Sequence, residues 1–169
     1  MYAVTSRGLL VLSLLACQTG HDVSGTGPAE TPAPVVSTET VALRTVSLTD
    51  THAVVDLEYR RRPEQPGPRV AELQLALTGV EFQAATAGDS ASRAGKQLVA
   101  QPSDGRLRLV LYGTGSLERL DSGTLAQLTL RRTGPVGRLE LLSDDPVFAP
   151  SEANDGVLLG APLTLGSAP

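Results

Sequence analysis

The chain has 169 residues and a formal net charge of −4, from 14 basic and 18 acidic side chains. Its length suits one domain with short extensions, and 41% hydrophobic residues are enough to build a packed core. The acidic balance argues against a nucleic-acid partner, because such proteins carry a basic surplus. One cysteine cannot form an internal disulfide or a multi-cysteine metal site.

Residues 1–16 are predicted to be a secretion signal. Arg7 precedes the apolar run Gly8–Ala16, which would be about 14 Å long as a helix and too short to cross a hydrocarbon core of about 30 Å. The next feature, Leu14-Leu15-Ala16-Cys17, resembles the lipobox of bacterial lipoproteins. The resemblance implies cleavage before Cys17 and a lipid anchor on its thiol and amino group, which would attach the chain to a membrane.

The predicted location is therefore the bacterial cell envelope. Gln18 follows the cysteine where an aspartate would favour the inner membrane, so the outer membrane or cell surface is favoured. The alternative is an ordinary signal peptide that contains a cysteine.

Residues 17–40 are predicted to be the acylated cysteine and a flexible linker. Gln18–Thr40 holds three glycines, three prolines and five threonines, but no leucine, isoleucine or aromatic residue. Such a segment cannot bury enough apolar surface to fold alone. Its reach as a flexible chain is about 25–30 Å.

Residues 41–167 are predicted to form an all-β domain, an antiparallel β-sandwich of about nine strands. Apolar residues recur with period two in short runs separated by turn residues. The pattern offers a single turn of helix, at Leu117–Leu120, and the Asp104-Gly105 pair predicts a hairpin. The expected strands are Val41–Leu48, His52–Tyr59, Val70–Leu77, Val80–Ala84, Lys96–Gln101, Arg106–Tyr112, Thr124–Arg132, Gly137–Leu142 and a run near Pro162–Leu165.

The order of these segments resembles the cohesin module of cellulosomal scaffolding proteins, over about residues 41–166. Val70–Leu77 resembles the third strand of that family, Arg106–Gly113 the sixth and Ser122–Leu130 the eighth. The resemblance implies a jelly-roll sandwich, no enzymatic activity, and non-covalent binding of a dockerin-like or other envelope protein. The family's binding surface is the outer face of the sheet made by strands three, five, six and eight.

Carried over by position, this resemblance implies a partner-binding face that mixes charged, amide and aromatic side chains. Tyrosine and arginine are frequent anchors in protein interfaces. The same residues would equally well form the solvated side of an amphipathic sheet, so both readings stay open. The face consists of Glu72, Gln74, Arg106, Arg108, Tyr112, Gln127, Thr129 and Arg131.

No catalytic residue, cofactor or metal ligand is predicted. His52 is the one histidine of the domain, and no Gly-x-Ser-x-Gly turn occurs. The acidic segments Asp144-Asp145 and Glu152–Asp155 do not match a calcium-binding loop. A carbohydrate-binding sandwich is the first alternative function, weakened by the absence of tryptophan. A hydrolase of envelope polymers is less favoured.

The loop Arg60–Arg69 has the highest density of charge. Its sequence RRRPEQPGPR could meet an acidic partner or lipid headgroups. Glu64 and three prolines interrupt the arginines, which favours a solvated loop.

Overall fold

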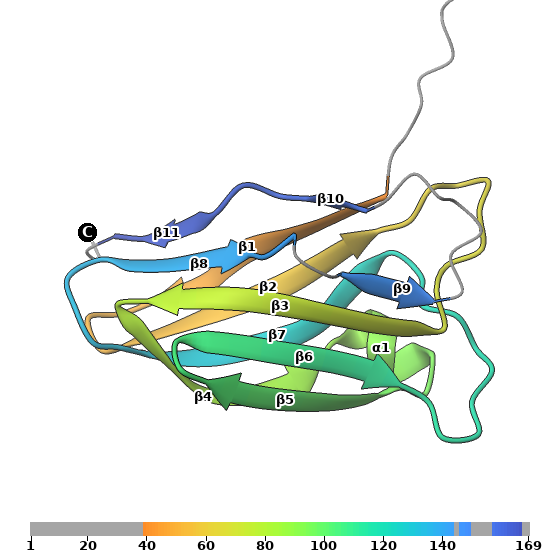
Figure 1. Ribbon diagram of the computed structural model, residues 1–169, viewed down its shortest axis with the longest axis horizontal. Helices are drawn as coiled ribbons and strands as arrows, with labels where there is room; N and C mark the ends of the chain where they lie inside the picture. Colours follow the sequence, from red (N-terminus) through yellow and green to blue (C-terminus); the bar gives the residue numbers. More distant parts are fainter. Residues whose placement is uncertain (1–38, 144–145, 150–156, 167–169) are drawn as a thin grey trace, which may run out of the picture. The chain divides into compact units, whose positions relative to one another are not determined.

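The computed structural model describes residues 39–143, 146–149 and 157–166. These residues form two facing β-sheets and one short helix (Figure 1). The predicted all-β sandwich is confirmed, and each of the nine expected strands is present. The predicted signal peptide, Cys17 and nearly all of the linker lie outside the described residues.

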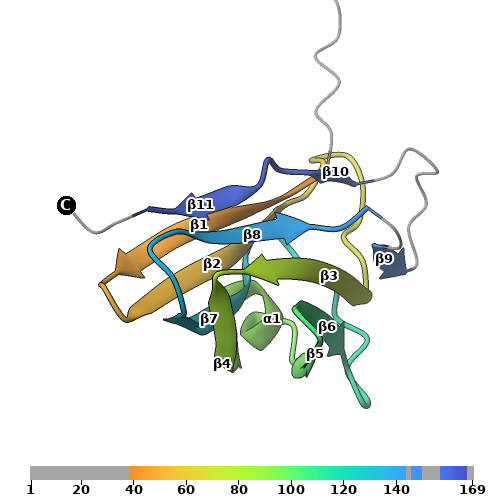
Figure 2. The same ribbon diagram turned by 60° about the vertical axis from the view of Figure 1, so that its left-hand side comes forward.

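We call the two layers the front sheet and the back sheet; they can be followed in Figures 1 and 2. Neighbouring strands are antiparallel, except that β10 pairs in parallel with β1. The back sheet has the order β10 (Leu158–Leu159), β1 (Thr40–Leu48), β2 (His52–Arg60), β7 (Gly123–Arg132) and β4 (Val80–Ala87). The front sheet has the order β11 (Leu163–Leu165), β8 (Gly137–Leu141), β3 (Val70–Thr78), β6 (Arg106–Tyr112) and β5 (Gln97–Ser103), and β9 (Val147–Ala149) also pairs with β3.

The core between the sheets is built from leucine. The fully buried large side chains are all leucines, and each contributes about 1.5–3 kcal/mol through burial. Strict alternation explains this for β3 and β6, since every second residue of each strand points inward. At one end of the core the rings of Tyr59 and Phe148 stack with centroids 5.8 Å apart. The Tyr59 hydroxyl donates a hydrogen bond to Glu39 (2.9 Å), and burial raises the pKa of this tyrosine.

The predicted hairpin between β5 and β6 is confirmed. Ser103 pairs with Arg106, so the turn consists of Asp104 and Gly105 alone. Their φ angles are 45° and 75°, as a two-residue type I′ turn requires at both positions. Asparagine, aspartate and glycine tolerate this conformation best, which is why the Asp-Gly pair was informative.

The helix lies where the sequence did not indicate one. Helix α1 spans Asp89–Arg93, and the predicted turn of helix at Leu117–Leu120 is wrong. Five residues are too few to show a helical period. The side chain of Asp89 instead fixes the segment locally, by accepting hydrogen bonds from the backbone N–H groups of Ser90 (2.7 Å) and Thr124 (2.8 Å).

Lys96 is the only lysine of the chain, and it is buried behind the loop that follows β6. Its ammonium group donates a hydrogen bond to the carbonyl oxygen of Ser116 (3.3 Å). Burial, and then the positive charge of Arg69, lower the pKa of this lysine. Lys96 therefore acts as an internal brace between this loop and the start of β5.

Candidate functional site

The outer surface of the front sheet, which we call the front face, carries three valines in register across its strands. Val99 of β5 pairs with Val110 of β6, and Val147 of β9 lies opposite Glu72 of β3, which in turn pairs with Val110. Val99 and Val110 are half-buried and Val147 is 40% exposed. We call Val99, Val110 and Val147 the valine row. Its members point away from the leucine core, so apolar surface is presented on the outside.

Polar residues occupy the next positions along the same strands. Arg108 of β6 pairs with Gln101 of β5 on one side and Gln74 of β3 on the other. Arg106 lies two residues before Arg108 on the same strand. A shallow hollow of about 420 Å³ lies among these side chains. It is lined by Gln74, Gln101, Ser103, Asp104, Arg106 and Arg108.

The two arginines of the front face differ in their partners. The Nε of Arg108 donates a hydrogen bond to Glu72 at 2.5 Å, an ion pair that lowers the pKa of Glu72 and raises that of Arg108. Within the described residues Arg106 has no ion pair and is exposed. Arg106 is therefore the cation that this face offers to another molecule.

Five of the eight predicted face residues come together and three do not. Glu72, Gln74, Arg106, Arg108 and Tyr112 share the front face. The last three belong to β7, which pairs with β2 and β4 in the back sheet; these are Gln127, Thr129 and Arg131. The prediction of a single face is therefore wrong for these three.

The error lies in which segment was matched to the family's eighth strand. On the side of β3 opposite β6, the neighbouring strand is β8, Gly137–Leu141, and not Ser122–Leu130. On β8 the outward residues are Arg138 and Glu140, which form an ion pair at 3.2 Å. Apolar and polar residues alternate in both Gly137–Leu141 and Ser122–Leu130. This pattern shows which side of a strand is buried, but it does not show which sheet the strand joins.

The outer surface of the back sheet, the back face, is held together by internal polar contacts. Asp56 is buried although it points outward, and it accepts hydrogen bonds from Arg44 (2.8 Å) and Gln127 (3.0 Å). Arg44 also bonds Glu58 at 2.5 Å, and Arg131 forms an ion pair with Glu81. Gln127 and Arg131 are thus engaged within the sheet.

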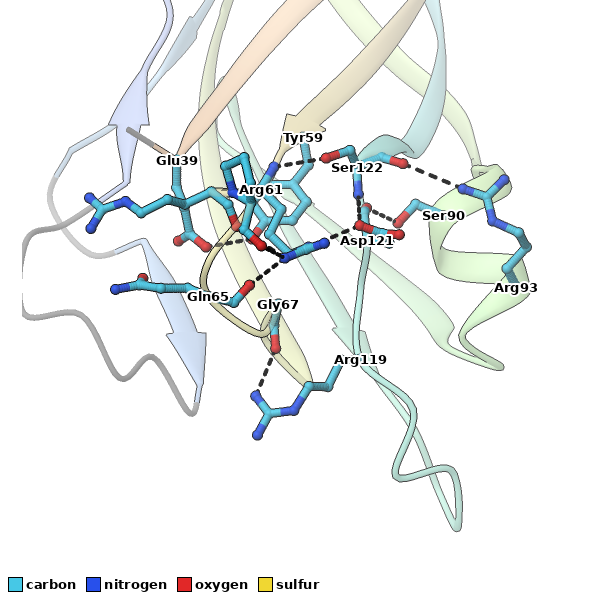
Figure 3. Close-up of polar contacts among 12 residues, drawn as sticks. Glu39, Tyr59, Arg61, Gln65, Gly67, Ser90, Arg93, Arg119, Asp121 and Ser122 are labelled. Atoms are coloured by element: carbon cyan, nitrogen blue, oxygen red, sulfur yellow. Dashed lines mark hydrogen bonds and ion pairs between the residues drawn. The ribbon is translucent and has the colours of Figure 1, made fainter. Parts of the chain in front are cut away.

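The Arg60–Arg69 loop is organised from within by Arg61 (Figure 3). The Arg61 side chain is 27% exposed; its Nε bonds Asp121 (3.0 Å), and its Nη1 donates to the carbonyl oxygens of Arg62, Pro63 and Gln65. The expectation of a solvated loop is therefore wrong for Arg61. This ion pair, together with the backbone N–H of Ser122, lowers the pKa of Asp121.

Close backbone contact fixes the other end of the same loop. A Cβ on Gly67 would lie 1.8 Å from the carbonyl oxygen of Leu120, so this position admits only glycine. Arg119 donates a hydrogen bond to the carbonyl oxygen of Gly67 at 2.8 Å (Figure 3). The loop is part of the framework at this end of the sandwich.

The described residues contain no group of three or more His, Cys, Asp or Glu side chains that could hold a metal ion. Asp144-Asp145 and Glu152–Asp155 lie outside the described residues. His52 is exposed, and its Nδ1 contacts the Thr51 hydroxyl at 2.9 Å. Within the part of the chain that the structure describes, no helix is long and apolar enough to cross a membrane.

Sequence reasoning missed the valine row, Gln101 and Ser103. Val110 alternates with Leu107, Leu109 and Leu111, so its outward position could have been read from the sequence. Its pairing with Val99 could have been found from the Asp104-Gly105 turn, which sets the register of β5 on β6. Val147 carried no such signal, because β9 has only three residues.

No protein-family model matches the sequence, and no curated protein matches it. Solved structures do match the fold. The third ScaC cohesin of Acetivibrio cellulolyticus, solved in complex with the ScaB dockerin, has a TM-score of 0.60 at 12% identity, covering 76% of this chain and 98% of its own.

Two further cohesins match in the same way. The cohesin CaCohA2 of Clostridium acetobutylicum has a TM-score of 0.56 at 13% identity, covering 78% of this chain and 93% of its own. The seventh ScaB type I cohesin of Pseudobacteroides cellulosolvens has a TM-score of 0.56 at 15% identity, covering 77% and 92%. The described domain therefore has the cohesin fold, as the strand order of the sequence suggested.

Proposed function

We propose that this chain is a non-catalytic binding module that holds a protein partner on its front face. The observation that carries the proposal is the valine row of the front face, which is bordered by the hollow around Arg108. The unpaired Arg106 lies two residues further along β6. Exposed apolar surface bordered by charge is typical of a protein interface, whose centre is apolar and whose rim is polar.

The partner that fits this surface has apolar side chains next to carboxylates. Apolar groups would cover the valine row, while a carboxylate would pair with Arg106. Tyr112 continues β6 beyond the valine row and supplies an aromatic anchor. The matching cohesin of Acetivibrio cellulolyticus was solved with a dockerin bound, which supports a dockerin-like partner for this chain.

Matched arginine variants test the face. We expect Arg106→Gln to weaken binding of a purified partner at least about tenfold, which corresponds to 1.4 kcal/mol. Arg131→Gln makes the same chemical change on the back face and should leave the affinity unchanged. Isothermal titration calorimetry measures both. Equal affinities for the two variants and the wild type would exclude the front face.

A glycan array tests the alternative function. A carbohydrate-binding module would bind a glycan and lose that binding in Tyr112→Ala, because sugars stack on aromatic rings. A protein-binding module gives no such signal. Glycan binding that depends on Tyr112 would replace the proposed function with the carbohydrate-binding one.

We further propose that Cys17 carries the lipid that holds this module at the bacterial envelope, at the outer membrane or cell surface. The support is the run Leu14-Leu15-Ala16-Cys17 after a short apolar segment. Mass spectrometry of the chain isolated from cells should show an acylated N-terminal cysteine. Cys17→Ser should abolish both the modification and the membrane association, and an unmodified Cys17 would contradict the anchor.

A further inference from the structure

The edge strands of the two sheets differ in how open they are to another strand. Edge strands expose unpaired backbone groups, and proteins usually protect them by shortness, bulges, charge or proline. In the back sheet β10 has two residues, and β4 contains a register shift between Phe82 and Ala84 and carries Glu81. In the front sheet β11 and β9 have three residues each.

The remaining edge strand, β5, lacks most of these protections. It has seven residues, none of them charged, and it pairs with β6 without a register shift. Within the described residues β6 is the only strand that pairs with β5. Leu98 and Ala100 face the core and are nevertheless only half-buried.

The hairpin turn determines which backbone groups of β5 are free. In a two-residue hairpin the residues flanking the turn, here Ser103 and Arg106, exchange both backbone hydrogen bonds. Hydrogen-bonded and non-hydrogen-bonded pairs alternate, so Gln97, Val99 and Gln101 bond to β6. The backbone groups of Leu98, Ala100 and Pro102 therefore point outward. Pro102 has no N–H, so the usable donors are those of Leu98 and Ala100.

Residues 97–101 have a similar order of polar and apolar side chains when they are read from either end. Gln97-Leu98-Val99-Ala100-Gln101 places an amide at each end, two small or medium apolar residues inside, and valine at the centre. An antiparallel copy centred on Val99 sets Gln97 opposite the second copy's Gln101 and Leu98 opposite the second copy's Ala100. Each Leu98–Ala100 pair then uses free N–H and C=O groups on both sides.

We propose that two copies of this chain pair through β5, antiparallel and centred on Val99, so that the two front sheets become one. The pairing brings no like charges together, because residues 97–101 are uncharged. It covers the half-buried Leu98 and Ala100 on both copies. A register centred one residue later would oppose Leu98 to Pro102 and lose a donor, so Val99 is the favoured centre.

The dimer has a consequence for the front face. Val99 of each copy meets the other at the two-fold axis, so Val99 and Val110 of both copies form one apolar row across the two front faces. Glu72 separates Val147 from this row at each end. This arrangement is independent of the proposed function, because the pairing is measured with no partner present.

Sedimentation velocity of the full chain carrying Cys17→Ser tests the pairing, over a concentration series reaching about 1 mM. We expect a monomer–dimer equilibrium. Val99→Lys places two ammonium groups at the two-fold axis and should weaken dimerisation more than tenfold. Gln83→Lys, the matched change on the exposed surface of β4, should leave it unchanged. A monomer throughout, or equal effects of the two lysines, would overturn the proposal.

Cysteine cross-linking tests the register of the pairing. It also tests the dimer itself if the Val99→Lys variant fails to fold. Replacing Val99 by cysteine in the Cys17→Ser chain gives one thiol, and opposed residues of a non-hydrogen-bonded pair lie close enough for a disulfide. We expect Val99→Cys to form disulfide-linked dimers faster than Gln83→Cys or Gln101→Cys. Faster cross-linking at position 101 would overturn the register, and equal rates at positions 83 and 99 would overturn the dimer.

Discussion

The front and back faces of this sandwich use their outward side chains in opposite ways. On the back face, Arg44, Gln127 and Arg131 are each bonded to a carboxylate of their own sheet. On the front face, the valine row and Arg106 make no such bond to a carboxylate. One ion pair, Arg108–Glu72, joins the two central strands β6 and β3.

This difference separates stability from recognition. A side chain that is satisfied within its own sheet contributes to the fold, and another molecule gains little by displacing its partner. An exposed valine or an unpaired arginine contributes little to the fold and is available for binding. The two faces come from equally alternating strands, so the distinction lies in cross-strand neighbours.

The largest expected difference between the two faces is in stability, and it comes from replacing Asp56. Asp56→Ala removes the acceptor that holds Arg44 and Gln127, and we expect it to lower the free energy of unfolding by about 1–3 kcal/mol. Gln74→Ala on the front face should cost less than about 0.5 kcal/mol. Urea unfolding measures both. Similar losses would show that the front face is as important for stability as the back face.

A smaller effect is expected from replacing one outward valine on each face by threonine. Val110→Thr should weaken partner binding by about 1 kcal/mol, because a hydroxyl enters the apolar row. Val54→Thr makes the same change on a half-buried outward position of β2 and should leave the affinity unchanged. Calorimetric titration distinguishes the two, and equal losses would remove the distinction between the faces.

The smallest effect concerns the Arg108–Glu72 ion pair. The hydrogen bond from Arg108 holds the pKa of Glu72 below its unfolded value, so its stabilisation is complete above that unfolded value, about 4.3, and is lost as the pH falls through the folded pKa. Glu72→Gln should therefore be less stable than the wild type at neutral pH, by an amount that shrinks in acid.

Urea unfolding at a series of pH values measures this difference. The control is the same substitution in an Arg108→Gln background, where the pH-dependent part should disappear. If it persists there, another neighbour sets the pKa of Glu72.

Much of the fold could be predicted from the sequence because alternation is a local signal. Leu107, Leu109 and Leu111 fix one face of β6 without reference to any other strand, and the Asp104-Gly105 turn fixes its pairing with β5. Strands β9 and β10 escaped prediction because they are short and contain no polar residue, so they show no alternation. These two strands form because β3 and β1 supply hydrogen-bond partners for their backbones.

The candidate site was harder to predict because it depends on which strands are adjacent. Gln127 has the outward position expected of it, but β7 joins the back sheet, where the side chain of Gln127 bonds Asp56. The partners of the buried Asp56 come from positions 44 and 127. Only the folded chain brings these positions together.

The buried Lys96 has a practical consequence for laboratory work. With thirteen arginines and this single lysine in the chain, amine-directed dyes, biotin esters and cross-linkers find almost no target on either face, and they react chiefly at the chain's amino terminus if it is free. Chemical mapping of this protein's contacts therefore calls for reagents aimed at carboxylates or guanidinium groups.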